Sequence, residues 1–152
     1  MRNESGRSLI EVIGVMAIAG VMTVSALGVF NMLRANQARS IASIELKQIA
    51  ENTKILLEMR GTYDGVSVNY LIKSGALTSD KAPLGGDAWS ITPGIDGTNF
   101  SINLVNLTNG ECNYFASKKP TWVKTLLING FEADISSNCF DSDTNQVSFI
   151  VE

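Results

Sequence analysis

Residues 6–30 read GRSLIEVIGVMAIAGVMTVSALGVF. No charged residue occurs from Val12 to Phe30, and these 19 residues reach the length of about 18 apolar residues that indicates a membrane-spanning helix. One carboxylate, Glu11, stands at the start of the apolar run. Because a charged side chain at the centre of a bilayer costs about 2.5–3.5 kcal/mol on insertion scales, an acid at this position needs an explanation.

A cleaved secretory signal is the alternative interpretation of this segment. The apolar part of such a signal has about 7–15 residues and ends at a small-residue cleavage site. Here the run is longer and continues into a helical pattern without turn residues, which favours a retained membrane helix. Arg2 and Arg7 precede the run and Arg34 and Arg39 follow it, so the distribution of basic residues does not determine the orientation.

The helical pattern extends well beyond the apolar run. Residues 31–60 contain neither Gly nor Pro, and at helical spacing they form a narrow polar stripe of Ser40, Ser43, Lys47, Glu51, Lys54 and Glu58. The other faces are mainly apolar and carry Ala35, Ala38, Ile41, Ala42, Ile49, Leu56 and Met59. The pattern predicts one helix from about Ser8 to Met59, roughly 75–80 Å long, whose membrane half is followed by an amphipathic half.

The rest of the chain predicts a small sheet that covers the amphipathic half. Gly and Pro residues between 61 and 86 indicate a loop, with a short helix at Val68–Lys73. The predicted strands are Trp89–Thr92, Asn99–Leu107 (with Phe100, Ile102, Leu104 and Asn106 on one face), Phe131–Ile135 and Gln146–Val151. A second helix is predicted at Tyr114–Leu127, and turns at Asn109-Gly110 and Asn129-Gly130. The expected fold class is α+β, a long N-terminal helix packed on a mainly antiparallel sheet of three or four strands.

Composition excludes several classes of function. The chain has 152 residues and a net charge of −3, and an acidic protein lacks the basic surface that nucleic acids require. It contains no His, the commonest general base and metal ligand, and no Ser/His/Asp, Cys/His or paired-carboxylate grouping. We therefore expect a protein that is not an enzyme, has no cofactor and does not bind nucleic acid.

Two cysteines, Cys112 and Cys139, lie in the polar half of the chain. In a small domain outside the cytosol such a pair forms a disulfide, here closing a loop of roughly 27 residues. Two reduced cysteines in a cytosolic domain are the alternative. If the disulfide forms, the N-terminus lies in the cytoplasm and the C-terminal domain is exported.

The stretch at the N-terminus resembles the type IV pilin and pseudopilin family. The residues that carry the resemblance are Gly6, Ser8-Leu9-Ile10-Glu11 and the apolar run to Phe30. The resemblance implies cleavage by a membrane prepilin peptidase between Gly6 and Arg7, with N-methylation of the new amino terminus. Glu11 would then be the fifth residue of the mature chain. The implied organisation is a leader at 1–6, a hydrophobic assembly helix at 7–33, an amphipathic helix at 34–60 and a globular head at 61–152 with a disulfide loop at 112–139.

The function implied by this resemblance is that of a structural subunit of a type IV pilus-like filament. Such a subunit spans the bacterial inner membrane once, with its N-terminus in the cytoplasm. Later it joins a helical homo-oligomer outside the cell through an assembly platform. A type II secretion pseudopilin and a non-polymerising single-span protein with a periplasmic binding domain are the alternatives. The C-terminal pattern is similar to type IVb pilins, whereas the six-residue leader is more similar to type IVa pilins and pseudopilins.

Two features depart from the family pattern. Arg7 replaces the apolar first residue of the mature chain, and Gly28 stands where type IVa pilins often have a proline. Because each interior Gly costs about 0.8–1 kcal/mol relative to Ala, Gly20 and Gly28 are expected to bracket a weak helical segment that stretches or melts in a filament.

For Glu11, the resemblance implies an ion pair with the amino terminus of a neighbouring subunit. Stabilisation by the positive end of its own helix is the alternative.

Two polar clusters are weaker candidates. Asp141, Asp143 and Asn145 have the spacing of the first half of a calcium loop, but Gln146 stands where an EF-hand requires Gly, so a polar turn is the preferred interpretation. Lys118, Lys119 and Lys124 form either an adhesive or DNA-binding patch or, more simply, a solvated face.

Overall fold

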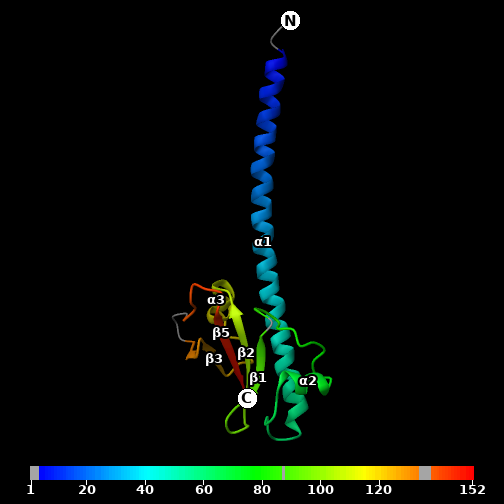
Figure 1. Cartoon of the computed structure of the whole chain (residues 1–152), viewed down its shortest axis with the longest axis vertical. Helices are drawn as coiled ribbons and strands as arrows, with labels where there is room; N and C mark the ends of the chain where they lie inside the picture. The colour runs from blue at the N-terminus through cyan, green and yellow to red at the C-terminus, as the bar shows by residue number, and fades with distance from the viewer. Residues whose placement is uncertain (1–3, 87, 134–137) are drawn as a thin grey trace. The chain divides into compact units, whose positions relative to one another are not determined.

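The computed structural model describes residues 4–86, 88–133 and 138–152. Its longest element is helix α1, Glu4–Glu58, close to the predicted helix from Ser8 to Met59 (Figure 1). The chain forms two compact units, Met1–Ala38 and Arg39–Glu152. Every side chain from Leu9 to Ala38 is exposed, and the part of α1 that begins at Leu9 is long and apolar enough to cross a membrane.

In the second unit, α1 buries one face against the sheet. The buried residues recur every three or four positions, as one stripe of a helix does: Ala42, Leu46, Ile49, Ala50, Thr53 and Leu57. Thr53 is tolerated in the core because its hydroxyl donates to the carbonyl of Ile49 at 2.7 Å. Of the predicted apolar residues, Ala42 and Ile49 are buried and Leu56 is half-buried, whereas Ile41 and Met59 are exposed.

The sheet has five antiparallel strands rather than three or four. They are β1 (Trp89–Pro93), β2 (Phe100–Leu107), β3 (Thr125–Ile128), β4 (Phe131–Glu132) and β5 (Asn145–Val151), in the spatial order β1-β2-β5-β3-β4. Alternation along each strand directs one set of side chains inward. Ile91, Ile102, Phe149 and Leu126 are cross-strand neighbours in one buried row.

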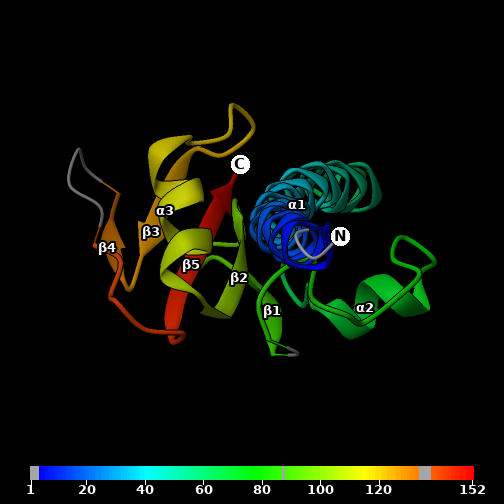
Figure 2. The same ribbon diagram turned by 90° about the horizontal axis from the view of Figure 1, so that it is seen from above.

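Helices cover the inner face of this sheet. Figure 2 shows α3 (Asn109–Ser117) and the part of α1 from Arg39 onward on the same side of the row of strands. Phe115 of α3 meets the ring of Phe149 edge-on, with ring centroids 5.1 Å apart, and Trp122 stacks on the same ring at 5.6 Å. A short helix, α2 (Val68–Lys73), matches its predicted bounds and buries Leu71. The α+β prediction is therefore confirmed.

The predicted helix at Tyr114–Leu127 is wrong. Thr108 caps α3 and forms a capping box with Glu111, so the helix starts at Asn109, where a turn was predicted. Helix α3 ends at Ser117, shortly before Pro120, and residues Thr125–Ile128 form β3 with alternating burial. The cap on Thr108 therefore outweighs the turn preference of Asn109-Gly110.

The second predicted turn is confirmed. Asn129 and Gly130 both have positive φ, 52° and 87°, and join β3 to β4 in a two-residue hairpin in which Ile128 pairs with Phe131. The strand predicted at Phe131–Ile135 ends at Glu132, and residues 134 and 135 lie outside the described part of the chain.

The end of β2 also differs from the prediction. Asn106 was expected on the inner face with Phe100, Ile102 and Leu104, but it is exposed and has a φ of 57°. The register between β2 and β5 shifts between Leu104 and Leu107. This irregularity returns Leu107, rather than Asn106, to the core.

Candidate assembly and surface sites

The N-terminal unit presents an apolar helix whose side chains from Leu9 to Ala38 are all exposed. Gly6 and Arg7 lie in the first turns of α1, and the side chain of Glu11 is exposed at the start of the apolar run. The hydroxyls of Thr23 and Ser25 donate to the carbonyls of Ala19 and Val21 four residues earlier, at 2.8 and 2.9 Å. Both hydroxyl groups are thereby satisfied within the helix and tolerate apolar surroundings. Glu11 is thus the one carboxylate that this run must accommodate.

The two glycines that were expected to weaken the helix do not interrupt α1 in the isolated chain. The helix continues through Gly20 and Gly28, and a Cβ atom added at either position would meet nothing within 4 Å. Close packing within the subunit therefore does not explain either glycine. Their expected role in a filament stays a prediction.

In the second unit, α1 carries exposed apolar side chains away from the sheet. Ile41, Ile44 and Ile55, which we name the outer isoleucine stripe, are 63%, 59% and 70% exposed. At 3.6 residues per turn they fall within a sector of about 60°. A polar stripe separates them from the buried face, with an ion pair of 3.6 Å between Lys47 and Glu51. This part of α1 therefore has two apolar faces, of which the head covers one.

A disulfide joins α3 to the segment before β5. Cys112 and Cys139 are bonded as predicted, with their Cα atoms 5.9 Å apart, and Cys112 is fully buried. Beside it, the side-chain amide of Asn109 donates to the carbonyl of Phe140 at 2.9 Å. The segment at Cys139–Phe140 is thereby tied to α3 by one covalent bond and one hydrogen bond.

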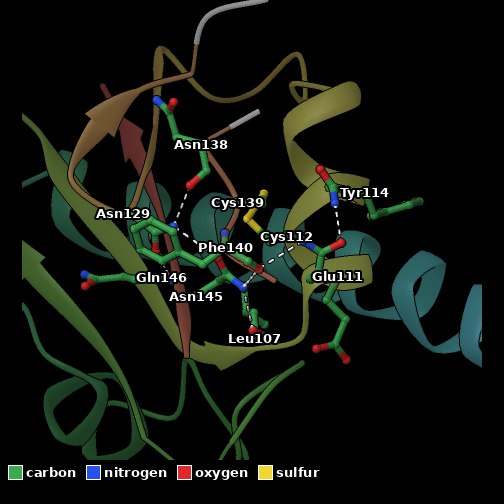
Figure 3. The surroundings of a disulfide bond; sticks show 12 residues. Leu107, Glu111, Cys112, Tyr114, Asn129, Asn138, Cys139, Phe140, Asn145 and Gln146 are labelled. Carbon is green, nitrogen blue, oxygen red and sulfur yellow. Dashed lines mark hydrogen bonds between the residues drawn. A yellow bond between two sulfur atoms is a disulfide. The ribbon is translucent and has the colours of Figure 1, made fainter. Parts of the chain in front are cut away.

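Two buried or half-buried amides hold the same segment to the sheet (Figure 3). The Asn145 side chain donates to the carbonyls of Leu107, Phe140 and Ser142 and accepts from the backbone N–H of Phe140 at 2.6 Å. Asn129 donates to the carbonyl of Asn138 at 2.7 Å and to the side-chain oxygen of Asn145 at 3.0 Å. Sequence patterns did not identify this network, because its partners are backbone groups brought together by strand pairing.

The acidic residues of the weak calcium candidate lie in the turn before β5. Asp141 and Asp143 are exposed, whereas Asn145 is fully buried. The carbonyl oxygen of the Asn145 side chain accepts hydrogen bonds from Phe140 and Asn129. Among the described residues, no group of three His, Cys, Asp or Glu side chains is placed to hold a metal ion.

The three lysines singled out in the sequence come together at the C-terminal end of α3. Lys119 donates its Nζ to the carbonyl of Lys124, and Lys124 forms an ion pair with Glu152. Lys118, Lys119 and Lys124 are all exposed. They form a small basic surface whose charge is offset in part by Glu152.

Two side chains near the turn between β1 and β2 have shifted pKa values. Hydrogen bonds from the side chain and the backbone of Thr98 lower the pKa of Asp96. Burial raises the pKa of Tyr63, and the nearby carboxylate of Glu58 raises it further. Tyr63 packs against Phe100 with ring centroids 4.8 Å apart, so it serves the core rather than a reactive site.

Comparisons with known proteins identify the fold. No model of a known protein family matches the chain, and no curated protein is similar to it in sequence. Among solved structures, the crystal structure of TcpA, a type IV pilin from Vibrio cholerae El Tor biotype, is similar with a TM-score of 0.60. The match covers 76% of this chain and 99% of that chain at 15% sequence identity.

Proposed function

We propose that this chain, which has the type IV pilin fold, is a structural subunit of a type IV pilus-like filament. Before assembly it is held in the bacterial inner membrane by a single span, with its N-terminus in the cytoplasm. One observation carries the proposal: the helix from Val12 to Phe30 contains no charged residue, and its side chains are exposed along its whole length. Such a surface requires lipid or protein around it.

Polymerisation supplies that protein surface when the subunit leaves the membrane. Apolar helices that lose contact with lipid regain burial by packing against the same helices of neighbouring subunits. The resulting homo-oligomer is held by lateral helix packing, and no catalytic chemistry is needed. The head forms the outer surface of the filament.

Glu11 sets the register of this packing under the proposal. An unpaired carboxylate among apolar helices is unfavourable, whereas a carboxylate paired with an amine is tolerated. Cleavage between Gly6 and Arg7 by a prepilin peptidase creates a new amine on Arg7, and Glu11 becomes the fifth residue of the mature chain. Pairing of Glu11 with the amine of a neighbouring subunit then selects one axial position.

A type II secretion pseudopilin is the second candidate function. Its filament would use the same apolar helix and the same processing, so the fold is compatible with both. The disulfide between Cys112 and Cys139 weighs against the major pseudopilin. A single-span protein that does not polymerise is the third possibility, and an unprocessed N-terminus would favour it.

One experiment tests the proposal directly. The full chain, carrying an epitope tag in a surface loop, is expressed in a piliated host, and sheared surface filaments are examined by immunogold electron microscopy. Mass spectrometry of the filament subunit determines its first residue. We expect labelled filaments whose subunit starts at Arg7. Absence of the subunit from every filament, together with an intact residue 6–7 bond, would contradict the proposal.

A further inference from the structure

Two aromatic side chains are held in solvent beside the disulfide. Phe131 and Phe140 are 66% and 57% exposed, and with Asn138 and Cys139 they line a hollow of about 240 Å³. Asp141 and Asp143 follow Phe140 and are exposed. We name Phe131, Phe140, Asp141 and Asp143 the aromatic–acidic patch. Exposed aromatic rings at the edge of a hollow are typical of protein interaction surfaces.

The backbone that presents these rings is fixed. The disulfide holds Cys139, and Asn145 binds both the N–H and the carbonyl of Phe140. Phe131 follows the two-residue turn at Asn129, whose side chain is bonded to Asn138 and Asn145. A fixed surface loses little conformational entropy on binding, which favours association.

The matching chemistry lies on the same head. Lys118, Lys119 and Lys124, which we name the lysine cluster, are exposed at the C-terminal end of α3 and the start of β3. A lysine stem packs on apolar surface while its ammonium group stays near a carboxylate or over an aromatic face. The patch offers both, because the exposed Asp141 and Asp143 follow Phe140 in the chain.

The patch and the cluster lie at opposite ends of the sheet. Asn145, two residues after Asp143, pairs with Leu107 at one end of β5. At the other end, the backbone N–H of Lys124 donates to the carbonyl of Ile150. Five residue steps along β5 separate Asn145 from Ile150, about 17 Å at 3.4 Å per residue. One subunit therefore cannot satisfy its own patch with its own cluster.

We propose that the aromatic–acidic patch of one subunit binds the lysine cluster of a second copy of the chain, in a head-to-tail contact along the filament. This inference rests on the proposed function, because the contact requires subunits that stand parallel in one filament. A contact between two different surfaces repeats without closing and builds an open helix. Exposed ion pairs alone contribute little, so the aromatic rings are needed to exclude water from the contact.

Charge reversal tests this contact in the full-length protein. Three variants are compared: Lys118→Glu with Lys119→Glu, Asp141→Lys with Asp143→Lys, and all four changes together. Each double variant is expected to reduce the yield of sheared filaments at least about tenfold, because like charges then repel at the contact. The variant with all four changes is expected to recover a yield within about threefold of that of the original chain, because its charges are again opposite. The matched control is the exposed pair Asp80→Lys with Lys81→Glu, which lies outside both surfaces.

Chemical cross-linking provides a second readout. A carbodiimide joins an amine to a carboxylate without a spacer. Because cluster and patch lie at opposite ends of β5, a product linking Lys118, Lys119 or Lys124 to Asp141 or Asp143 joins two subunits. We expect this product from filaments of the original chain and not from detergent-solubilised subunits.

The outcomes separate this inference from the proposed function. If the original chain forms no filaments, the proposed function fails and the contact fails with it. If the original chain polymerises but both charge-reversed pairs assemble normally, only the contact is wrong. It is also overturned if the fourfold variant does not recover, or if filaments of the variants are normal and lose only attachment to another surface.

Discussion

At the scale of single residues, Glu11 carries the sharpest prediction. We expect Glu11→Ala to leave the subunit processed between Gly6 and Arg7 but to lower filament yield at least about tenfold, because the carboxylate that pairs with the neighbouring amine is lost. Glu45→Ala, which removes an exposed acid from α1 within the second unit, is the control. The measurements are immunoblots of sheared filaments and mass spectrometry of the N-terminus. Normal filaments from Glu11→Ala would contradict the pairing and favour simple stabilisation of the helix start.

A second residue, Asn145, is predicted to matter for folding. Its buried side chain bonds the carbonyls of Leu107, Phe140 and Ser142 and the N–H of Phe140. Replacement by Ala removes the partner of the buried carbonyl of Leu107 and of the half-buried carbonyl of Ser142 and N–H of Phe140, whereas the carbonyl of Phe140 keeps its bond from Asn109. A buried polar group left without a partner costs about 1–3 kcal/mol. We expect Asn145→Ala to lower the free energy of unfolding by at least about 2 kcal/mol, measured by urea denaturation of the detergent-solubilised chain.

Asn103→Ala is the matched control for this prediction. Asn103 also makes three side-chain hydrogen bonds, to Ser90, Thr92 and Ser101, but its partners are hydroxyls near the solvent that water can satisfy. The control is expected to change the free energy of unfolding by less than about 1 kcal/mol. Equal effects of the two substitutions would mean that the Asn145 network has no special role.

At the scale of elements, the outer isoleucine stripe links α1 to assembly. Ile44→Asp is expected to leave the fold unchanged, because Ile44 is exposed in the subunit, and to reduce filament yield because it places a charge on an apolar packing surface. Ile44→Leu keeps the apolar surface and should assemble normally. The readouts are thermal unfolding of the solubilised subunit and the amount of sheared filament. Full assembly of Ile44→Asp would show that this face stays in water.

The disulfide belongs to the same scale, since it joins α3 to the segment before β5. Replacing Cys112 and Cys139 by Ala together releases a loop with a sequence separation of 27 residues. The chain-entropy relation predicts a loss of about 3–4 kcal/mol in the free energy of unfolding. Urea denaturation checks this value. An unchanged midpoint would mean that the amide network alone holds the segment.

Elements differed in how far the sequence predicted them. The helix of 55 residues and strand β2 follow periodic patterns long enough to be unambiguous, and both were placed within a few residues of their bounds. The segment from Asn109 to Ile128 was predicted wrongly. A cap at Thr108 and a proline at 120 divide this stretch into a short helix and a short strand. Short apolar segments fit either period, so only their pairing with β5 decides between them.

At the scale of the whole molecule, sequence and structure contribute different parts of the candidate sites. The motif around Glu11 is local, so the sequence alone carries the resemblance on which the proposed processing and assembly residues rest. The aromatic–acidic patch is not local. The outward position of Phe140 depends on the disulfide between the preceding Cys139 and Cys112. It also depends on hydrogen bonds from Asn109 and Asn145 to its carbonyl. The separation of Lys124 from Asp143 likewise depends on the pairing of β5 with its neighbours.

The last prediction concerns α1 in the assembled filament. The helix is continuous through Gly20 and Gly28 in the isolated chain, and neither glycine is needed for close packing there. Each glycine lowers helix stability by about 0.8–1 kcal/mol relative to Ala, so the segment between them is the easiest part of the helix to extend when subunits pack.

We expect a map of the filament to show extended or melted backbone between Val21 and Leu27. Gly20→Ala with Gly28→Ala should keep the helix intact and lower the yield of filaments, whereas Gly14→Ala serves as a control outside the segment. A filament map of the original chain with unbroken helix from Val21 to Leu27 would exclude this role, and the two glycines would then have to act by letting neighbouring helices approach.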